Sequence, residues 1–138
     1  MIKEIVKDIG ILQQKSEEFK FGEDDYLITD LIDTANANIE HCAGLACIQI
    51  GTAKKVVVVR IGDKFVPMIN PMIIKRSQET FVAKERCLSL DGEREVKRHK
   101  KIKVGYTTQN GKRKCEDFGG FVAQVIQHEC DHLKGILI

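Results

Sequence analysis

The 138-residue chain lacks any apolar run near the roughly 20 residues that a membrane-spanning helix needs. Its first eight residues mix both charge signs and lack the apolar core of a signal peptide. The chain also lacks a large excess of either charge sign, because it has 22 lysines and arginines and 20 aspartates and glutamates. The net charge of +2 therefore selects no class of charged partner. These absences predict a cytoplasmic protein with no membrane partner.

The cysteines lack C-x-x-C spacing, which argues against a structural zinc ribbon. There are five of them, an odd number, so they cannot all pair within one chain. We expect free thiols or metal ligands rather than a disulfide framework. The chain also lacks internal repeats, low-complexity segments and a convincing linker. At this length, with 43% hydrophobic residues, a single domain over residues 1–138 is expected.

Hydrophobic periodicity predicts a helix, then several mostly antiparallel strands, then a second helix. Three- and four-residue spacing favours a first helix from about Asp24 or Asp25 to His41, after an irregular or partly helical stretch. Strands are expected at 56–60, 65–68, 72–74, 95–106 and 112–117, with turns at Asn70-Pro71 and Asn110-Gly111. The second helix is expected at 121–134, capped by Gly135. This order predicts an α+β domain with its strands around a central C-terminal helix.

The second helix carries an H-E-x-x-H motif, His128-Glu129-Cys130-Asp131-His132. The two histidines are four residues apart and share one helix face, where their imidazoles can bind one metal ion. Glu129 lies beside them as a candidate general base. The motif also occurs by chance, but buried polar groups on an otherwise apolar core helix are costly unless they are satisfied. A metal site would satisfy them.

A third ligand has to come from upstream, since few residues follow the motif. Cys130 is two residues from His128 and points elsewhere on the helix, so we expect a buried apolar role for it. The remaining candidates are Cys42, Cys47, Cys87, Cys115, His41 and His99. Cys87 is favoured, because it is expected on an irregular segment between strands, just before an Asp-Gly turn. Cys115, in the second strand of a hairpin, is expected to be structural.

Three segments, in the same order, resemble the motifs of the peptide deformylase family. Residues 42–49 resemble G-x-G-x-A-A-x-Q, residues 85–89 resemble E-G-C-L-S, and residues 127–132 match Q-H-E-x-D-H in full. The resemblance covers nearly the whole chain. It implies the deformylase fold and a metal-dependent hydrolase that removes the N-formyl group from N-formylmethionyl nascent peptides.

The resemblance also implies a role for each matching residue. The ligands of one divalent metal ion, Fe²⁺ in cells and Zn²⁺ or Ni²⁺ in purified protein, would be Cys87, His128 and His132. Glu129 would be the general base during attack by metal-bound water, with Gln49 and the backbone N–H of Leu88 stabilising the oxyanion. The substrate-binding residues would be Ala43, Gly44, Glu85 and Arg86. Arg98 would pair with Glu85, and Asp131 would orient a metal ligand.

The chain departs from the family pattern at three positions. Cys42 and Cys47 replace a glycine and an alanine, and Arg86 replaces the glycine before the expected ligand cysteine. The arginine could narrow the cleft, bind an acidic group, or turn to solvent. Two alternatives therefore remain: a deformylase-like hydrolase with altered substrate choice, or a non-catalytic metal- or peptide-binding module. A generic H-E-x-x-H peptidase would leave Cys87 and Gln49 unexplained.

Basic residues recur over residues 94–103 and again at 112–114. They could make a transient contact with ribosomal RNA. No aromatic residues are interleaved for base stacking, so a solvated strand face is favoured. Family members usually continue past the metal helix with a segment that can dock on the ribosome, and docking by that route is not expected here. The oligomeric state stays open.

Overall fold

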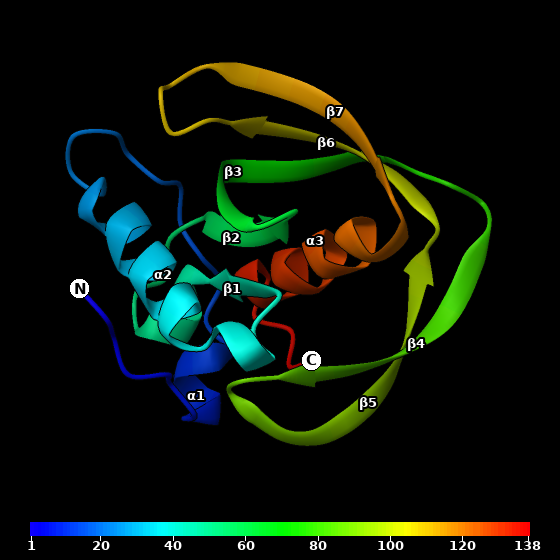
Figure 1. The fold of residues 1–138 in the computed structure, drawn as a ribbon, viewed down its shortest axis with the longest axis horizontal. Helices are drawn as coiled ribbons and strands as arrows, with labels where there is room; N and C mark the ends of the chain where they lie inside the picture. Colours follow the sequence, from blue (N-terminus) through cyan, green and yellow to red (C-terminus); the bar gives the residue numbers. More distant parts are fainter.

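The computed structural model describes residues 1–138, as helices and antiparallel strands (Figure 1). The helices are α1 (Ile9–Leu12), α2 (Tyr26–Ala37) and α3 (Gly120–Leu133), with 3₁₀ turns η1 (Ile39–His41) and η2 (Cys47–Ile50). The strands are β1 (Gly44–Ala46), β2 (Val56–Ile61), β3 (Lys64–Arg76), β4 (Thr80–Cys87), β5 (Leu90–His99), β6 (Lys101–Thr107) and β7 (Arg113–Gly119). One sheet has the order β1-β2-β3-β6-β7, and β4 and β5 form a second. The predicted α+β class and its C-terminal helix are confirmed.

Strand β2 is buried on both faces, because a helix packs on each. Side chains alternate along a strand, so Val57 and Val59 face the cluster that contains Ile126 of α3. Val56 and Val58 face the cluster that contains Leu31 of α2. Figure 1 shows α3 in the middle of the molecule, with the β4–β5 ribbon curving round the side away from β2. The metal-binding motif thus lies on the central helix.

The expectation of two short strands at 65–68 and 72–74 is wrong. Asn70 and Pro71 lie inside one long strand, β3, and the register with β6 shifts between Ile69 and Met72. Asn70 has a φ of 48°, a left-handed conformation that asparagine tolerates and that bends a strand without ending it. Its side chain also accepts a hydrogen bond from the backbone N–H of Phe19. The turn signal marks a bulge.

The single strand expected at 95–106 is also wrong. Residues 90–99 pair with β4, whereas residues 101–107 pair with β3 and β7, so the chain changes sheets at Lys100. Strand β4 was not expected at all. Its two buried residues are Ala83 and the charged Glu85, so it shows no clean apolar alternation. Cys87 consequently ends a strand of a hairpin and does not lie on an irregular segment.

The helix ends differ by a few residues from expectation. The first helix stops at Ala37 and continues as the 3₁₀ turn η1. Asp24 and Asp25 bond the backbone of the preceding turn at Lys20 and Gly22, and neither caps α2. Gly135 caps α3 as expected, with a φ of 77°. No helix has the length and apolar character needed to cross a membrane.

Candidate metal centre and active site

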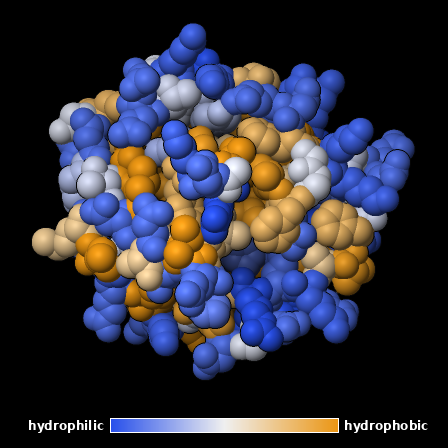
Figure 2. Space-filling view, viewed as in Figure 1, coloured by the Kyte–Doolittle hydropathy of each residue, from blue (hydrophilic) through white to orange (hydrophobic).

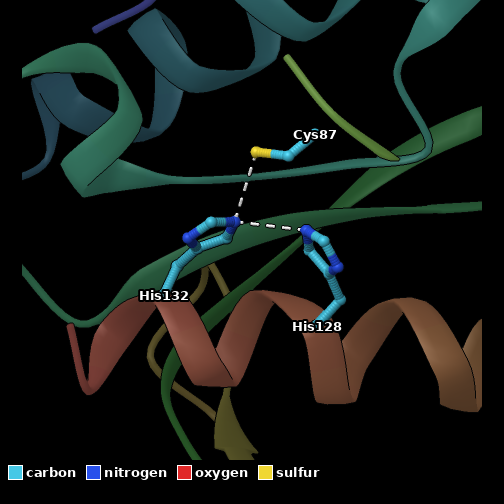
Figure 3. A group of neighbouring side chains, drawn as sticks. All are labelled: Cys87, His128 and His132. Atoms are coloured by element: carbon cyan, nitrogen blue, oxygen red, sulfur yellow. Dashed lines mark hydrogen bonds between the residues drawn. The ribbon is translucent and has the colours of Figure 1, made fainter. Parts of the chain in front are cut away.

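Three side chains converge between α3 and the end of β4 (Figure 3). His132 Nε2 lies 3.2 Å from His128 Nε2 and 3.4 Å from Cys87 Sγ. The three donor atoms all lie within 4.8 Å of one another. A tetrahedral ion with bonds of about 2.0 Å to nitrogen and about 2.3 Å to sulfur would separate its ligands by about 3.3 to 3.6 Å. The donor set therefore fits one divalent ion, and none of the other candidate cysteines and histidines belongs to it.

A carboxylate behind His128 fixes its orientation. Nδ1 of His128 lies 2.7 Å from Glu85 Oε1 and donates to it, since a carboxylate can only accept. This leaves Nε2 free to bind a metal. Arg98 also donates to both oxygens of Glu85, at 2.9 and 2.6 Å, so the expected Arg98–Glu85 pair is present. Burial by itself would raise the pKa of Glu85, but the hydrogen bonds from Arg98 and His128 lower it to about 2.

The β4–β5 hairpin is held against α3 by further polar contacts. Arg98 Nη1 donates to Asp131 Oδ2 at 2.6 Å, so Asp131 supports the site without binding the metal. Gln127 accepts from the backbone N–H of His99 and donates to its carbonyl oxygen, both at 2.9 Å. Sequence reasoning missed this role of Gln127, although Gln127 is the first residue of the matched Q-H-E-x-D-H segment. Together these contacts place Cys87 opposite the two histidines.

The two histidines differ in electrostatic environment. Burial, together with the charge of His128, lowers the pKa of His132 to about 3, so its imidazole is neutral. Burial also acts to lower the pKa of His128, but hydrogen bonds with Cys87 and Glu85 outweigh it and raise the pKa to about 10. A metal ion bound at Nε2 would take the place of that proton. Metal binding would therefore release a proton, as is usual for histidine ligands.

Glu129 is buried next to the candidate metal ligands, and only 3% of the residue is exposed. Its Oε1 atom makes no hydrogen bond, which is costly for a buried carboxylate. Burial raises its pKa to about 7. Gly44 makes room for this side chain, because a Cβ atom there would lie 2.8 Å from Glu129 Oε2. The expected base is thus a poised carboxylate packed against the edge strand β1.

A cavity of about 500 Å³ opens beside these groups, and every predicted catalytic and substrate-binding residue lines it. Figure 2 shows hydrophobic residues gathered near the middle of this view, with hydrophilic residues towards its periphery. The apolar part of the cavity lining includes Ile39, Leu88, Phe121 and Val125. Arg86 lies at the mouth, where its side chain is 78% exposed and pairs with Glu93 at 2.7 Å. It turns to solvent, one of the three outcomes considered for it.

Glu85 also belongs to the lining, but both of its oxygens are already hydrogen-bonded inside the protein. Its contacts hold His128, which makes it a positioning residue in this structure. Gln49 is buried too, and its Oε1 accepts from the backbone N–H of Ala46 at 3.0 Å. Its Nε2 donates to Cys87 Sγ and to Ser89 Oγ, both at 3.2 Å. Sequence reasoning did not single out Ser89.

Comparison with known proteins extends this picture beyond geometry. A family model described as polypeptide deformylase matches residues 2–138. A peptide deformylase of Clostridium beijerinckii is 51% identical over 138 residues, which cover all of both chains. The chain belongs to the polypeptide deformylase family. The predicted function is therefore confirmed: it is a metal-dependent hydrolase that removes the formyl group from N-formylated peptides.

Solved deformylase structures share the fold closely. The structure from Thermotoga maritima superposes with a TM-score of 0.89 at 33% identity, covering 99% of this chain and 95% of that one. A class I type b deformylase from Acinetobacter baumannii with Met-Ala-Ser bound gives 0.90 at 29% identity, covering 99% and 97%. The deformylase fold extends along the whole chain, and the arrangement of the β4–β5 ribbon round α3 belongs to it.

Proposed function

We propose that Cys87, His128 and His132 hold one divalent metal ion, Fe²⁺ in cells, and that the surrounding residues direct it at the formyl group. When bound, such an ion is a Lewis acid that polarises a carbonyl and lowers the pKa of a water molecule. Two neutral imidazoles and one thiolate leave the fourth tetrahedral position open, as a catalytic site requires. The proximity of the three donor atoms supports this assignment.

The observation that carries the catalytic proposal is the buried Glu129 carboxylate, which has an unpartnered oxygen in the wall of the cavity. A carboxylate with a pKa of about 7 can take a proton and return it near neutral pH. In our proposal Glu129 accepts the proton of the attacking water and delivers it to the leaving amine. No hydrogen bond inside the protein competes for its Oε1 atom.

The oxyanion that forms on the formyl carbonyl is stabilised, in this proposal, by Gln49 and the backbone N–H of Leu88. The Gln49 Nε2 atom is directed at Cys87 Sγ and therefore at the metal position. Leu88 follows Cys87 directly, and its N–H makes no hydrogen bond within the chain. Each such donor contributes about 100- to 1,000-fold to the rate in known enzymes.

The substrate is proposed to bind as an extended peptide along β1. This strand lies at the edge of its sheet, so backbone groups near Ala43 and Gly44 can pair with another strand. Arg86 and Leu88 line the same cavity as Ala43 and Gly44, and the apolar part of the lining would accept the methionine side chain. We further propose a cytoplasmic location, because all five cysteines are free. A transient contact with the ribosome, where nascent chains emerge, completes the proposal.

Turnover of formyl-Met-Ala-Ser by the Fe²⁺- or Ni²⁺-loaded protein tests these roles. Glu129→Ala should lower kcat about 100- to 10,000-fold, the usual contribution of a general base, while one metal ion per chain is retained. Glu95→Ala removes an exposed carboxylate of β5 and serves as the control with unchanged turnover. Full activity of a metal-loaded Glu129→Ala protein would rule out the proposed base.

Altered substrate choice has a separate test at Arg86. Because this side chain turns to Glu93 and solvent, Arg86→Gly should change kcat/KM for formyl-Met-Ala-Ser by less than about threefold. A wild type without turnover, beside an active Arg86→Gly variant, would instead show that the arginine excludes this substrate.

A further inference from the structure

A second cavity, of about 520 Å³, opens where β3, β6 and β7 lie side by side, away from the metal ligands. We name it the basic groove after the four cationic side chains in its lining, Lys75, Arg76, Lys101 and Lys103. None of the ion pairs in the structure includes any of the four. Asp117 is the one acidic residue among the lining residues. The groove therefore carries an excess of positive charge.

The strand register makes this arrangement costly for the fold. Lys75 of β3 and Lys103 of β6 are direct cross-strand partners, so their side chains leave the same face of the sheet. Like charges directly opposite one another destabilise a sheet. Asp117 is the partner of Lys103 on the other side, yet no ion pair forms between them. No ion pair within the chain offsets this repulsion, whereas a bound anion would do so.

We propose that the basic groove binds the phosphate backbone of double-helical RNA. A concave surface admits the ridge of phosphates along a duplex, whereas a flat lipid bilayer cannot reach into it. Phe118 is the one aromatic residue of the lining, and it packs against the hydrophobic core. No exposed ring is thus available for stacking on unpaired bases, so binding rests on phosphate contacts and is independent of sequence.

The groove lies close to the catalytic cavity along the chain. Phe118 and Gly119 line the groove, and Phe121, in the first turn of α3, lines the catalytic cavity. RNA bound in the groove would therefore lie close to the start of α3. This would keep the catalytic cavity near an RNA-rich particle. The inference rests on the ribosome contact within the proposed function and names the surface that would make it.

Fluorescence anisotropy with a labelled 20-base-pair RNA duplex, titrated over a range of KCl concentrations, tests the inference. Four phosphate contacts predict a slope near about −3.6 for the logarithm of the binding constant against that of salt concentration. Lys75→Glu with Lys103→Glu should weaken binding about 30-fold or more and lower the slope by about two units. Lys75→Gln with Lys103→Gln should weaken it less, by about 10-fold.

The matched control is Lys15→Glu with Lys64→Glu, which makes the same change in net charge at two exposed lysines that lie outside the groove. Its affinity for the duplex should stay within about threefold of the wild type. An equal loss in both pairs, or no wild-type binding at low salt, would overturn the proposal. Binding to phosphatidylserine vesicles but not to RNA would overturn it too, in favour of a membrane.

Formyl-peptide turnover is measured on the same preparations. The groove variants should turn over formyl-Met-Ala-Ser like the wild type, because no groove residue lines the catalytic cavity. A failure of the proposed catalytic roles would appear in turnover alone, and a failure of the RNA proposal in anisotropy alone. Urea unfolding midpoints of both charge-reversal pairs confirm that each variant is folded.

Discussion

At the scale of single residues, the site depends on Gly44 as much as on the charged groups. A Cβ atom at this position would lie 2.7 Å from Val125 Cγ1 and 2.8 Å from Glu129 Oε2. Real Cβ atoms do not approach other atoms so closely, so one neighbour would have to move. The Glu129 carboxylate is the end of a flexible side chain and is the group that would give way. Glycine here keeps the proposed base in position.

Gly44→Ala should therefore retain the metal but lose activity. A displacement of about 1 Å at a catalytic group can cost about 100-fold, so we expect kcat to fall about 10- to 100-fold with one ion still bound per chain. Gly119→Ala is the control, because its Cβ would meet other atoms only at 3.8 Å. Metal analysis and formyl-Met-Ala-Ser kinetics on both variants decide the matter. A kcat equal to that of the wild type in Gly44→Ala would show that a Cβ atom at this position does not displace Glu129.

The motifs predicted which residues belong to the site, but not every contact that those residues make. Gln49, Cys87 and Glu129 stand in motif positions, and all of them line the cavity or supply a donor. The contacts of Gln127 with His99 and of Ser89 with Gln49 join segments far apart in sequence. No local pattern encodes such a contact, because it depends on how the hairpin is placed against the helix.

At the scale of elements, periodicity located the helices and the buried strand β2 but not the partners of the long strands. Residues 95–104 contain no glycine, proline, asparagine, aspartate or serine. The sequence therefore gave no sign that the chain crosses from one sheet to the other at Lys100. Asn70 was misread because its side chain tolerates a positive φ in a bulge as well as in a turn. Both errors concern pairing between strands, which local propensity leaves undetermined.

The C-terminal end of α3 offers a prediction about stability. Gly135 donates to the carbonyl of His132, and Ile136 donates to that of Asp131, which is the Schellman pattern. A Cβ atom on Gly135 would lie only 2.2 Å from the carbonyl oxygen of Gln13. Gly135→Ala should therefore lower the free energy of unfolding by about 2–5 kcal/mol, from a left-handed conformation and from overpacking together.

Gly62→Ala separates the two contributions to that loss. Gly62 has a φ of 66°, but nothing lies within 4 Å of its Cβ position, so only the conformational cost of about 1–2 kcal/mol should remain. Urea denaturation of both variants, with unchanged m-values, measures the difference. If Gly135→Ala were no more destabilising than Gly62→Ala, the close contact with Gln13 would not constrain the fold.

At the scale of the whole molecule, the proposed metal site joins the β4–β5 ribbon to α3. The β4–β5 ribbon supplies Cys87, and α3, packed under the larger sheet, supplies the two histidines. The ribbon also reaches the helix through the Arg98–Asp131 and Glu85–His128 pairs. Bound metal should therefore hold the ribbon against the helix, and its removal should expose Cys87 without unfolding the core.

The number of reactive thiols tests whether bound metal protects Cys87 and holds the ribbon against the helix. All five cysteines are free; Cys115 is exposed, Cys42, Cys47 and Cys130 are buried, and Cys87 is between. Burial raises the pKa of Cys47 to about 12, so it has almost no thiolate at pH 8.

In the metal-loaded protein, one thiol, that of Cys115, should react rapidly with a chromogenic disulfide reagent. Cys87 should not react, because a metal-bound thiolate is protected. Chelation should add one more from Cys87, and denaturant the remaining three. Cys115→Ser should lower each count by one, while circular dichroism checks that the chelated protein stays folded. If two thiols of the metal-loaded protein reacted rapidly before chelation, Cys87 would not be a metal ligand. The proposal that the ribbon and the helix bind the metal together would then be wrong.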